Sequence, residues 1–204
     1  MSTPPAPAPN LVRYVDIRDR IQDGDLFLWR GQYKSSELFE NLTHAFYSHA
    51  AIAARWHDRL MVLQAEAHVE TVALSVAIAT YPGRVDWYRL KREAIPGHEQ
   101  IVTGALAEAK ADLGLPFGAV DLLKSLWARF TRKFLPNARV AKALFCSEYV
   151  HRCFRAGGLD LTGMPDIDTM PQDIANCRYI EYVATVEHNP KDVGDRTKDD
   201  VPPN

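Results

Sequence analysis

The segment from Ser48 to Glu66 constrains the fold of this chain most strongly, because it predicts two neighbouring antiparallel strands. Ser48 to Ala54 is rich in small residues, Arg55 to Arg59 forms a polar turn, and Leu60 to Glu66 is a second apolar run. Two strand-like runs joined by so short a turn are typical of a β-hairpin. The rest of the predicted fold is built around this pair.

Further strands and helices are predicted on both sides of the hairpin. The strand predictions are 26–29, 69–74, 84–90 and 178–186, and the helix predictions are 11–22, 35–47, 97–113, 119–134, 145–155 and 171–176. Strands concentrated in one part of a chain and helices in another favour an α+β arrangement over a wound βαβ sheet. We therefore expect an α+β fold, with an antiparallel sheet packed against helices.

The length and composition predict one domain. A chain of 204 residues with 47% apolar content can bury one sizeable core, whereas two independent cores would be cramped. We expect a disordered proline-rich arm over residues 1–10, a single catalytic domain over 11–186 and a disordered polar tail over 187–204.

The charge pattern and the apolar runs limit the partners. The net charge is −2 and the basic residues are spread along the chain, so we expect no nucleic-acid partner. No apolar run approaches the ~20 residues of a transmembrane helix. The first residues do not resemble a secretory signal, so the expected location is the cytoplasm, with delivery by a phage or a secretion system left open. The oligomeric state stays open.

Three cysteines, Cys146, Cys153 and Cys177, form no CxxC pair. An odd number without an export signal favours reduced thiols over disulfides, and the spacing does not suit a zinc site. We expect no metal and no cofactor.

Cys146 is the candidate nucleophile because it opens the helix predicted over 145–155. The positive end of a helix macrodipole and the free backbone N–H groups there favour a thiolate, and the same N–H groups can hold an oxyanion. From this segment alone Cys146 reads equally well as a small buried residue. A partner base has to decide between the two readings.

His49 is the candidate base, because it stands at the start of a predicted strand and is followed by small residues. A general base needs a rigid mount, and small neighbours let a helix pack close. The alternative is a structural histidine at a strand end. The other histidines fit less well: His44 and His57 fall near a helix end and in a turn, and the positions expected to be exposed are His98, His151 and His188.

A third polar residue is expected to orient the base. Gln64, Glu66 and His68 alternate along the neighbouring run and therefore share one face of the predicted strand. Gln64 would hold a neutral imidazole, whereas Glu66 would stabilise the imidazolium more strongly. His68 is the weaker candidate, and a solvated strand face is the alternative for all three.

Four segments, taken in order, resemble a known family. They are Gly24 to Phe27 at the first strand, Tyr47 to Ile52 around the histidine, Leu63 to Ala65 with Val69 and Leu74 after it, and Phe145 to Val150 around the cysteine. The set resembles the circularly permuted, papain-like branch of the NlpC-type cysteine peptidase superfamily. That branch includes the YiiX-like proteins and, more distantly, the lecithin:retinol acyltransferases. The histidine precedes the cysteine, as in the permuted members.

The resemblance implies a permuted papain-like fold with the nucleophile at a helix N-terminus. It implies Cys146 as nucleophile, His49 as base and Gln64 as the third group, at a position where the YiiX-like proteins are expected to have glutamate; Glu66 is the alternative for that role. The implied activity is that of a cysteine hydrolase, of amidase, peptidase or thioesterase type. It would cleave an amide or (thio)ester bond of a peptide or lipid-like substrate through an acyl-enzyme.

Two other functions stay open. One is a lipid-directed acyltransferase or hydrolase, which the basic and aromatic segment from Leu126 to Phe134 favours. The other is a binding module that keeps the fold without turnover, which glutamine at position 64 permits.

Overall fold

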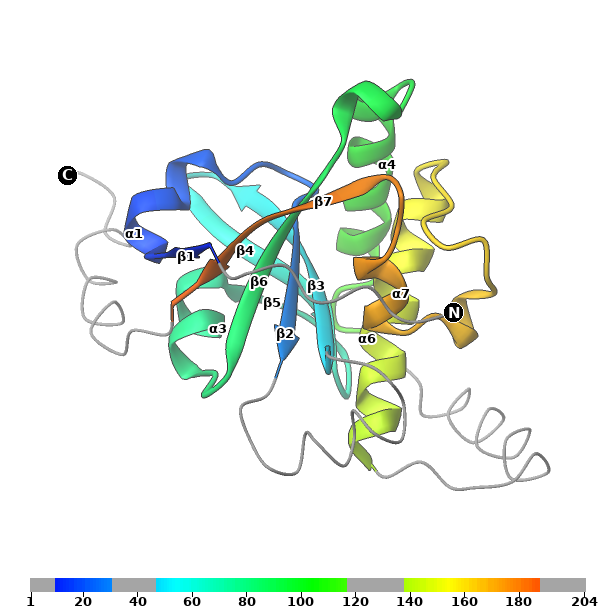
Figure 1. Ribbon diagram of the computed structural model, residues 1–204. Coiled ribbons are helices and arrows are strands. Elements are labelled where there is room, and N and C mark those ends of the chain that lie inside the picture. Colours follow the sequence, from blue (N-terminus) through cyan, green and yellow to red (C-terminus); the bar gives the residue numbers. More distant parts are fainter. Residues whose placement is uncertain (1–9, 31–46, 117–137, 188–204) are drawn as a thin grey trace.

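The fold is that of a computed structural model, which describes residues 10–30, 47–116 and 138–187, with residues 138–145 described by their backbone alone. In these residues a mixed sheet carries helices on both faces (Figure 1). The strands are β1 (Leu11–Val12), β2 (Leu26–Arg30), β3 (His49–Trp56), β4 (Arg59–Ala65), β5 (Val69–Ala73), β6 (Arg84–Leu90) and β7 (Ile180–Val186). The α-helices are α1 (Tyr14–Ile17), α3 (Leu74–Thr80), α4 (His98–Ala111), α6 (Ala138–Ala156) and α7 (Pro171–Ala175), and the 3₁₀ turns are η1 (Arg18–Arg20), η2 (Arg92–Ala94) and η3 (Asp166–Asp168).

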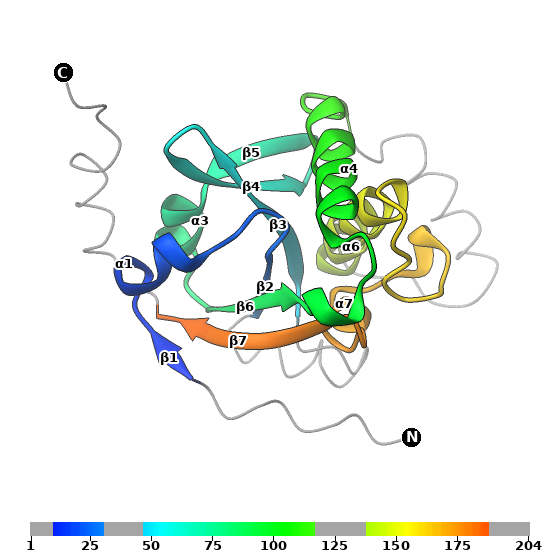
Figure 2. The same ribbon diagram turned by 90° about the horizontal axis from the view of Figure 1, so that it is seen from above.

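The sheet has the strand order β1-β7-β6-β2-β3-β4-β5. The short β1 runs parallel to β7, and each of the other neighbouring pairs is antiparallel. The view from above shows the sheet curling, with α4, α6 and α7 outside the curve and α1 and α3 at its open side (Figure 2). The α+β prediction is confirmed at this level of description.

The two faces of the sheet bury separate cores. The core on the side of α6, called here the α6-side core, includes Leu28, Ala50, Ile52, Leu63, Cys146 and Val150. The core on the side of α3, the α3-side core, includes Phe27, Trp29, Ala51, Val62, Leu74 and Ile78. Because strand side chains alternate between the faces, neighbouring residues of β3 belong to different cores.

The predicted hairpin is present as β3 and β4. Ile52 pairs with Leu63 and Trp56 with Arg59, so the strands meet in an antiparallel ladder. His57 closes the turn with a φ of 57°, a left-handed conformation uncommon outside glycine. The strands predicted over 26–29, 69–74, 84–90 and 178–186 appear as β2, β5, β6 and β7. Alternating or continuous apolar runs were therefore a sufficient signal for most of the sheet.

A buried carboxylate joins β2 to β6. Asp25 is 2% exposed, and its oxygens accept hydrogen bonds from the Trp87 indole at 2.9 Å and from Arg89 Nε and Nη2 at 2.9 and 2.7 Å. These charge-assisted bonds compensate for burying the charge and raise the pKa of Arg89. Gly24 precedes it with a φ of 82°, and a Cβ there would lie 2.9 Å from Val102 Cγ1. The Gly-Asp motif is thus a structural anchor of β2.

Helices α4 and α6 pack closely through two glycines. A Cβ on Gly104 would lie 2.8 Å from Gly157 Cα, and one on Gly157 would lie 2.3 Å from the carbonyl oxygen of Ile101. The absence of side chains at both positions lets the two backbones touch. The contact fixes the C-terminal end of α6 against α4.

Two predicted helices differ from the structure. Residues 11–22 form β1, the one-turn α-helix α1 and the 3₁₀ turn η1. The helix does not include residues 11 and 12, because the Asn10 and Val12 carbonyls accept hydrogen bonds at 2.9 Å from the N–H groups of Thr185 and Glu187, in and just after β7. The helix predicted over 145–155 begins at Ala138, since the residues before position 145 are mostly good helix formers. The helix predicted over 119–134 and residues 35–46 of the helix predicted over 35–47 lie outside the described residues. So do residues 1–9 of the predicted arm (1–10) and 188–204 of the predicted tail (187–204), whereas Asn10 and Glu187 hydrogen-bond to the ends of β7 and β1. In the described part, no helix is both long and apolar enough to cross a bilayer.

Candidate functional site

His49 is held at the first position of β3. Its side chain is 8% exposed, and its ring meets the Trp29 ring edge-on, with centroids 5.1 Å apart. The two residues are direct partners in the β2–β3 ladder, so the sheet register brings the rings together. The imidazole therefore has the rigid mount that a base requires.

Gln64 binds the His49 ring. His49 Nε2 lies 2.9 Å from Gln64 Oε1, and Gln64 is 7% exposed. Gln64 pairs with Glu70 on β5, and the β3–β4 register places its side chain on the same face as that of His49. Of the candidates for the third polar group, the structure thus brings Gln64 to the imidazole.

Glu70 determines which way the Gln64 amide points. Gln64 Nε2 donates a 2.8 Å hydrogen bond to Glu70 Oε1. A carboxylate only accepts, so the NH₂ end of the amide faces Glu70 and the carbonyl end faces His49. His49 must then donate from Nε2, which leaves its buried Nδ1 as the basic nitrogen. Sequence reasoning missed Glu70; its even spacing from Gln64 across a hairpin was the available signal.

Glu66 and His68 occupy other positions around this chain of contacts. Glu66 lies in the bend after β4, where its N–H donates to the carbonyl of His68 at 3.1 Å. The His68 side chain is 55% exposed and its Nε2 lies 3.4 Å from Glu70 Oε2. Gln64 is therefore the acceptor for His49 Nε2, and in the described part of the chain His68 is linked to Gln64 through Glu70.

Cys146 is buried inside α6, and the helix-start argument for it does not hold. The residue is 0% exposed and stands eight residues after Ala138, where α6 begins. Backbone N–H groups in the middle of a helix are bonded within it, so they neither hold an oxyanion nor present the positive end of the macrodipole. Activation of this thiol would have to come from a neighbouring side chain.

The other two thiols are ordinary core residues. Cys153 is 0% exposed, and burial raises its pKa to about 12. Cys177 is 7% exposed, and burial raises its pKa as well. Both are neutral near pH 7 and are poor nucleophiles there. These two cysteines therefore act as small apolar residues of the core.

Cys146 and His49 come from elements that pack together, since α6 lies against β3 and β4 (Figure 1). Cys146 belongs to the α6-side core with Ala50 and Ile52, whereas His49 contacts Trp29 of the α3-side core. The pairing of the two residues stays a prediction.

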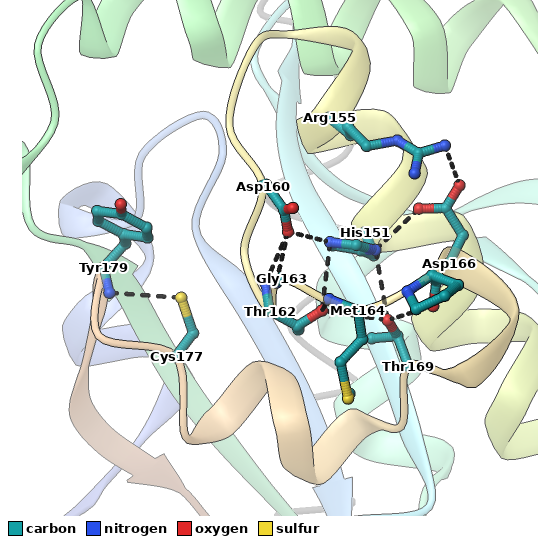
Figure 3. A network of polar contacts seen from close by, with 11 residues as sticks. His151, Arg155, Asp160, Thr162, Gly163, Met164, Asp166, Thr169, Cys177 and Tyr179 are labelled. Carbon is teal, nitrogen blue, oxygen red and sulfur yellow. Dashed lines mark hydrogen bonds and ion pairs between the residues drawn. The ribbon is translucent and has the colours of Figure 1, made fainter.

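His151 is predicted on the surface and is instead 0% exposed. Its Nε2 lies 3.0 Å from Asp160 Oδ1, its Nδ1 lies 2.8 Å from Asp166 Oδ1, and Thr169 Oγ1 is 3.3 Å from Nδ1 (Figure 3). The prediction is wrong because α6 is covered there by the loop that follows it. The buried positions 147, 150, 151 and 154 repeat at helical spacing, which was the signal for a buried histidine.

No family model and no curated protein matches this sequence. Among solved structures, the chain is similar to the crystal structure of the metalloprotein YiiX from Escherichia coli O157:H7, DUF1105. The TM-score is 0.55 at 18% identity, over 82% of this chain and 98% of that one. The comparison shows a shared fold. Membership of the NlpC-type, papain-like branch is not part of what it shows.

YiiX is described as a metalloprotein, which raises the question of a metal centre in this chain. Across the part of the chain that the structure describes, no three His, Cys, Asp or Glu side chains converge as a metal site would require. The described residues therefore do not fit a metal centre, and no step below depends on one.

Proposed function

We propose that this chain is a cysteine-dependent hydrolase in which His49 is the base and Cys146 the nucleophile. The observation that carries the proposal is the oriented imidazole: Gln64 and Glu70 leave His49 with its basic nitrogen at Nδ1. A buried histidine held in one tautomer by two successive polar groups is the arrangement that proton transfer needs. The fold shared with YiiX is compatible with it.

The proposed reaction follows the usual course of acyl transfer. His49 Nδ1 takes the proton of the Cys146 thiol, and the sulfur attacks the carbonyl carbon of an amide or (thio)ester. The leaving amine, alcohol or thiol departs with that proton, and an acyl-enzyme remains. His49 then deprotonates water, which attacks the acyl carbon and releases a carboxylic acid and the free thiol. Gln64 cannot supply a counter-charge to the imidazolium, but the Glu70 carboxylate lies one hydrogen bond behind it.

The substrate is proposed only as an acyl compound, peptide-like or lipid-like. The segment that favoured a lipid-directed enzyme, 126–134, lies outside the described residues. Cys146 lies in the α6-side core, whereas His49 contacts Trp29 of the α3-side core, and this keeps the binding module as the contrary outcome.

The proposal is tested by trapping the acyl-enzyme. The protein is incubated with p-nitrophenyl acetate, quenched in acid and mapped by peptide mass spectrometry. We expect acetyl on Cys146 in the wild type, none on the peptide in Cys146→Ala, and at least about tenfold slower acylation in His49→Ala. Cys153→Ala is the matched control, because it removes a buried thiol of the same helix and should leave the acylation unchanged.

Two results would overturn the proposal. One is acylation of Cys146 at the same rate with and without His49. The other is no acylation of Cys146 in a wild-type protein whose circular dichroism shows it folded, in which case the chain is a binding module.

A further inference from the structure

His151 is a buried histidine to which the proposed hydrolysis gives no role, and it lies between two carboxylates of the loop that follows α6. Its side chain is 0% exposed, with Asp160 Oδ1 at 3.0 Å from Nε2 and Asp166 Oδ1 at 2.8 Å from Nδ1 (Figure 3). Both carboxylates belong to residues 160–169, called here the α6 loop. The histidine thus attaches the α6 loop to α6 at two points.

The two contacts determine how many protons the imidazole carries. An ionised carboxylate only accepts hydrogen bonds, and a neutral imidazole has a single N–H, so a neutral His151 would turn a nitrogen lone pair towards Asp160 or Asp166. Oδ1 of Asp166 is buried and makes no hydrogen bond among the described residues, so a positive charge on the imidazole 2.8 Å away is what compensates it. Protons on both ring nitrogens suit both contacts.

The extra proton belongs to the imidazole rather than to either carboxylate. The backbone N–H of Gly163 donates to Asp160 at 2.7 Å and is the main cause of the lowered pKa of this carboxyl group, so Asp160 is ionised near pH 7. Arg155 Nη2 lies 2.5 Å from Oδ2 of Asp166 and forms an ion pair with it. Two carboxylates therefore face two cations, Arg155 and the His151 imidazolium.

The elements packed against α6 bring no further charge into contact with the imidazole in the described part of the chain. Asp112, just after α4, forms an ion pair with Arg152. Asp173 of α7 accepts a hydrogen bond from the Met170 N–H at 2.8 Å. Asp168 of η3 is exposed, and the residues that β3 and β4 contribute to the α6-side core are uncharged. The protonation of the imidazole therefore depends on the two loop carboxylates.

The α6 loop has a second attachment to α6 and borders a cavity. Ser147, one turn before His151 on α6, donates a 2.5 Å hydrogen bond to the carbonyl of Thr169 at the end of the loop. Residues 160–164 form one wall of a cavity of about 570 Å³, whose other wall includes the turn 176–179. Release of the loop from the histidine would leave this wall of the cavity without its attachment to α6.

We propose that His151 is a pH-sensitive switch: with protons on both ring nitrogens it holds the α6 loop against α6, and loss of one proton releases the loop at one carboxylate. The proton leaves to water past Asp160, whose side chain is 52% exposed and one hydrogen bond from the ring. The attached state needs the imidazolium, so it is the low-pH state, and the released state is the high-pH one. The switch does not depend on whether Cys146 reacts.

The switch is tested by ¹⁵N NMR of the whole chain, labelled in the histidine rings and in the backbone, between pH 5 and pH 10. We expect the His151 ring to carry two protons at the lower end and one at the upper end. The backbone amides of 160–169 should shift with the same midpoint. Protection of the Gly163 and Thr169 amides, relative to the unstructured rate at each pH, should fall about tenfold or more, the loss expected from one charged hydrogen bond.

Asp166→Asn distinguishes the switch from a histidine that only fills space. The asparagine NH₂ can donate to Nδ1 of a neutral ring while its carbonyl accepts from Arg155, so the loop should stay attached across the whole pH range. Asp168→Asn is the matched control, because Asp168 is an exposed carboxylate of the same 3₁₀ turn, and its midpoint should equal that of the wild type. His151→Gln should remove the midpoint from the loop amides.

Three results would overturn the proposal. They are a His151 ring that keeps one protonation state from pH 5 to pH 10, loop amides that do not follow the ring, and a midpoint in Asp166→Asn equal to that of the wild type. Because Asp166→Asn keeps hydrogen-bonding groups on both sides, it tests the switch even if His151→Gln does not fold.

Discussion

Replacing Glu70 with glutamine should change the tautomer of His49. In the wild type the Gln64 NH₂ group faces the Glu70 carboxylate at 2.8 Å, and reversing the amide would set a carbonyl oxygen against that carboxylate. A hydrogen bond to a charged group contributes about 1.5–3 kcal/mol, and each 1.4 kcal/mol is about tenfold in population. The Nε2–H tautomer of His49 should therefore exceed the other by at least about tenfold.

Glutamine at position 70 can turn either its carbonyl or its NH₂ group towards Gln64. The preference for one amide orientation then falls to about 1:1, and so does the tautomer ratio of His49. If His49 is the base, about half of the molecules keep a basic Nδ1, which by itself lowers the acylation rate about twofold, and the loss of the Glu70 charge behind Gln64 lowers it further. The tautomer ratio is therefore the direct test of the amide orientation.

The assay is ¹⁵N NMR of histidine-labelled protein at pH 8, well above the usual histidine pKa of about 6.5, where the protonated and unprotonated ring nitrogens have distinct shifts. His68→Gln is the matched control, since it removes the other partner of Glu70 and leaves the amide oriented. A wild type with the proton on Nδ1, or Glu70→Gln with an unchanged tautomer ratio, would refute the reasoning. Neither result depends on whether the chain has a substrate.

Three further predictions concern the thiols, the helix contact and acid stability. Iodoacetamide at pH 8 should leave Cys153 unmodified and react slowly with Cys177, because burial raises both pKa values; peptide mapping in which Cys146 reacts no faster would count against its role. Gly157→Ala should lower the free energy of unfolding by about 1–3 kcal/mol, because the new Cβ would lie 2.3 Å from a carbonyl oxygen of α4, and a urea melt within error of the wild type would contradict this. The folded-state pKa of Asp160 is below its unfolded value, so its contribution to stability is present above about pH 4 and is lost as the pH falls through the folded pKa; an acid titration followed by circular dichroism should be flatter in Asp160→Asn.

The sheet was predictable from sequence because its signals are local. The apolar runs of β2, β3, β4 and β6 have strand lengths and stand between turn residues, and these patterns survive in the fold. The choice of Gln64 as a candidate for the third polar group also rested on a local signal, because alternation along β4 indicates which face of the sheet its side chain is on.

The remaining features depend on contacts between distant segments. The role of Glu70 needs the β4–β5 register, and the burial of His151 needs the loop that returns over α6. Leu11 and Val12 form β1 instead of helix because they pair with the edge of β7, far along the chain. Helix α6 begins at Ala138, whereas the helix predicted from the residues around Cys146 begins at Phe145; the good helix formers before position 145 were not counted.

Pairing of β1 with the end of β7 sets the two ends of the described domain side by side. Asn10 accepts a hydrogen bond from Thr185 at 2.9 Å, and Val12 accepts one from Glu187. A short linker could join residue 187 to residue 10, and new ends could open in the His57 turn without removing a rung of the β3–β4 ladder. In that chain Cys146 would precede His49. The order of Cys146 and His49 along the chain thus depends on where the backbone is cut. Their positions in α6 and β3 are set by the fold and would stay the same.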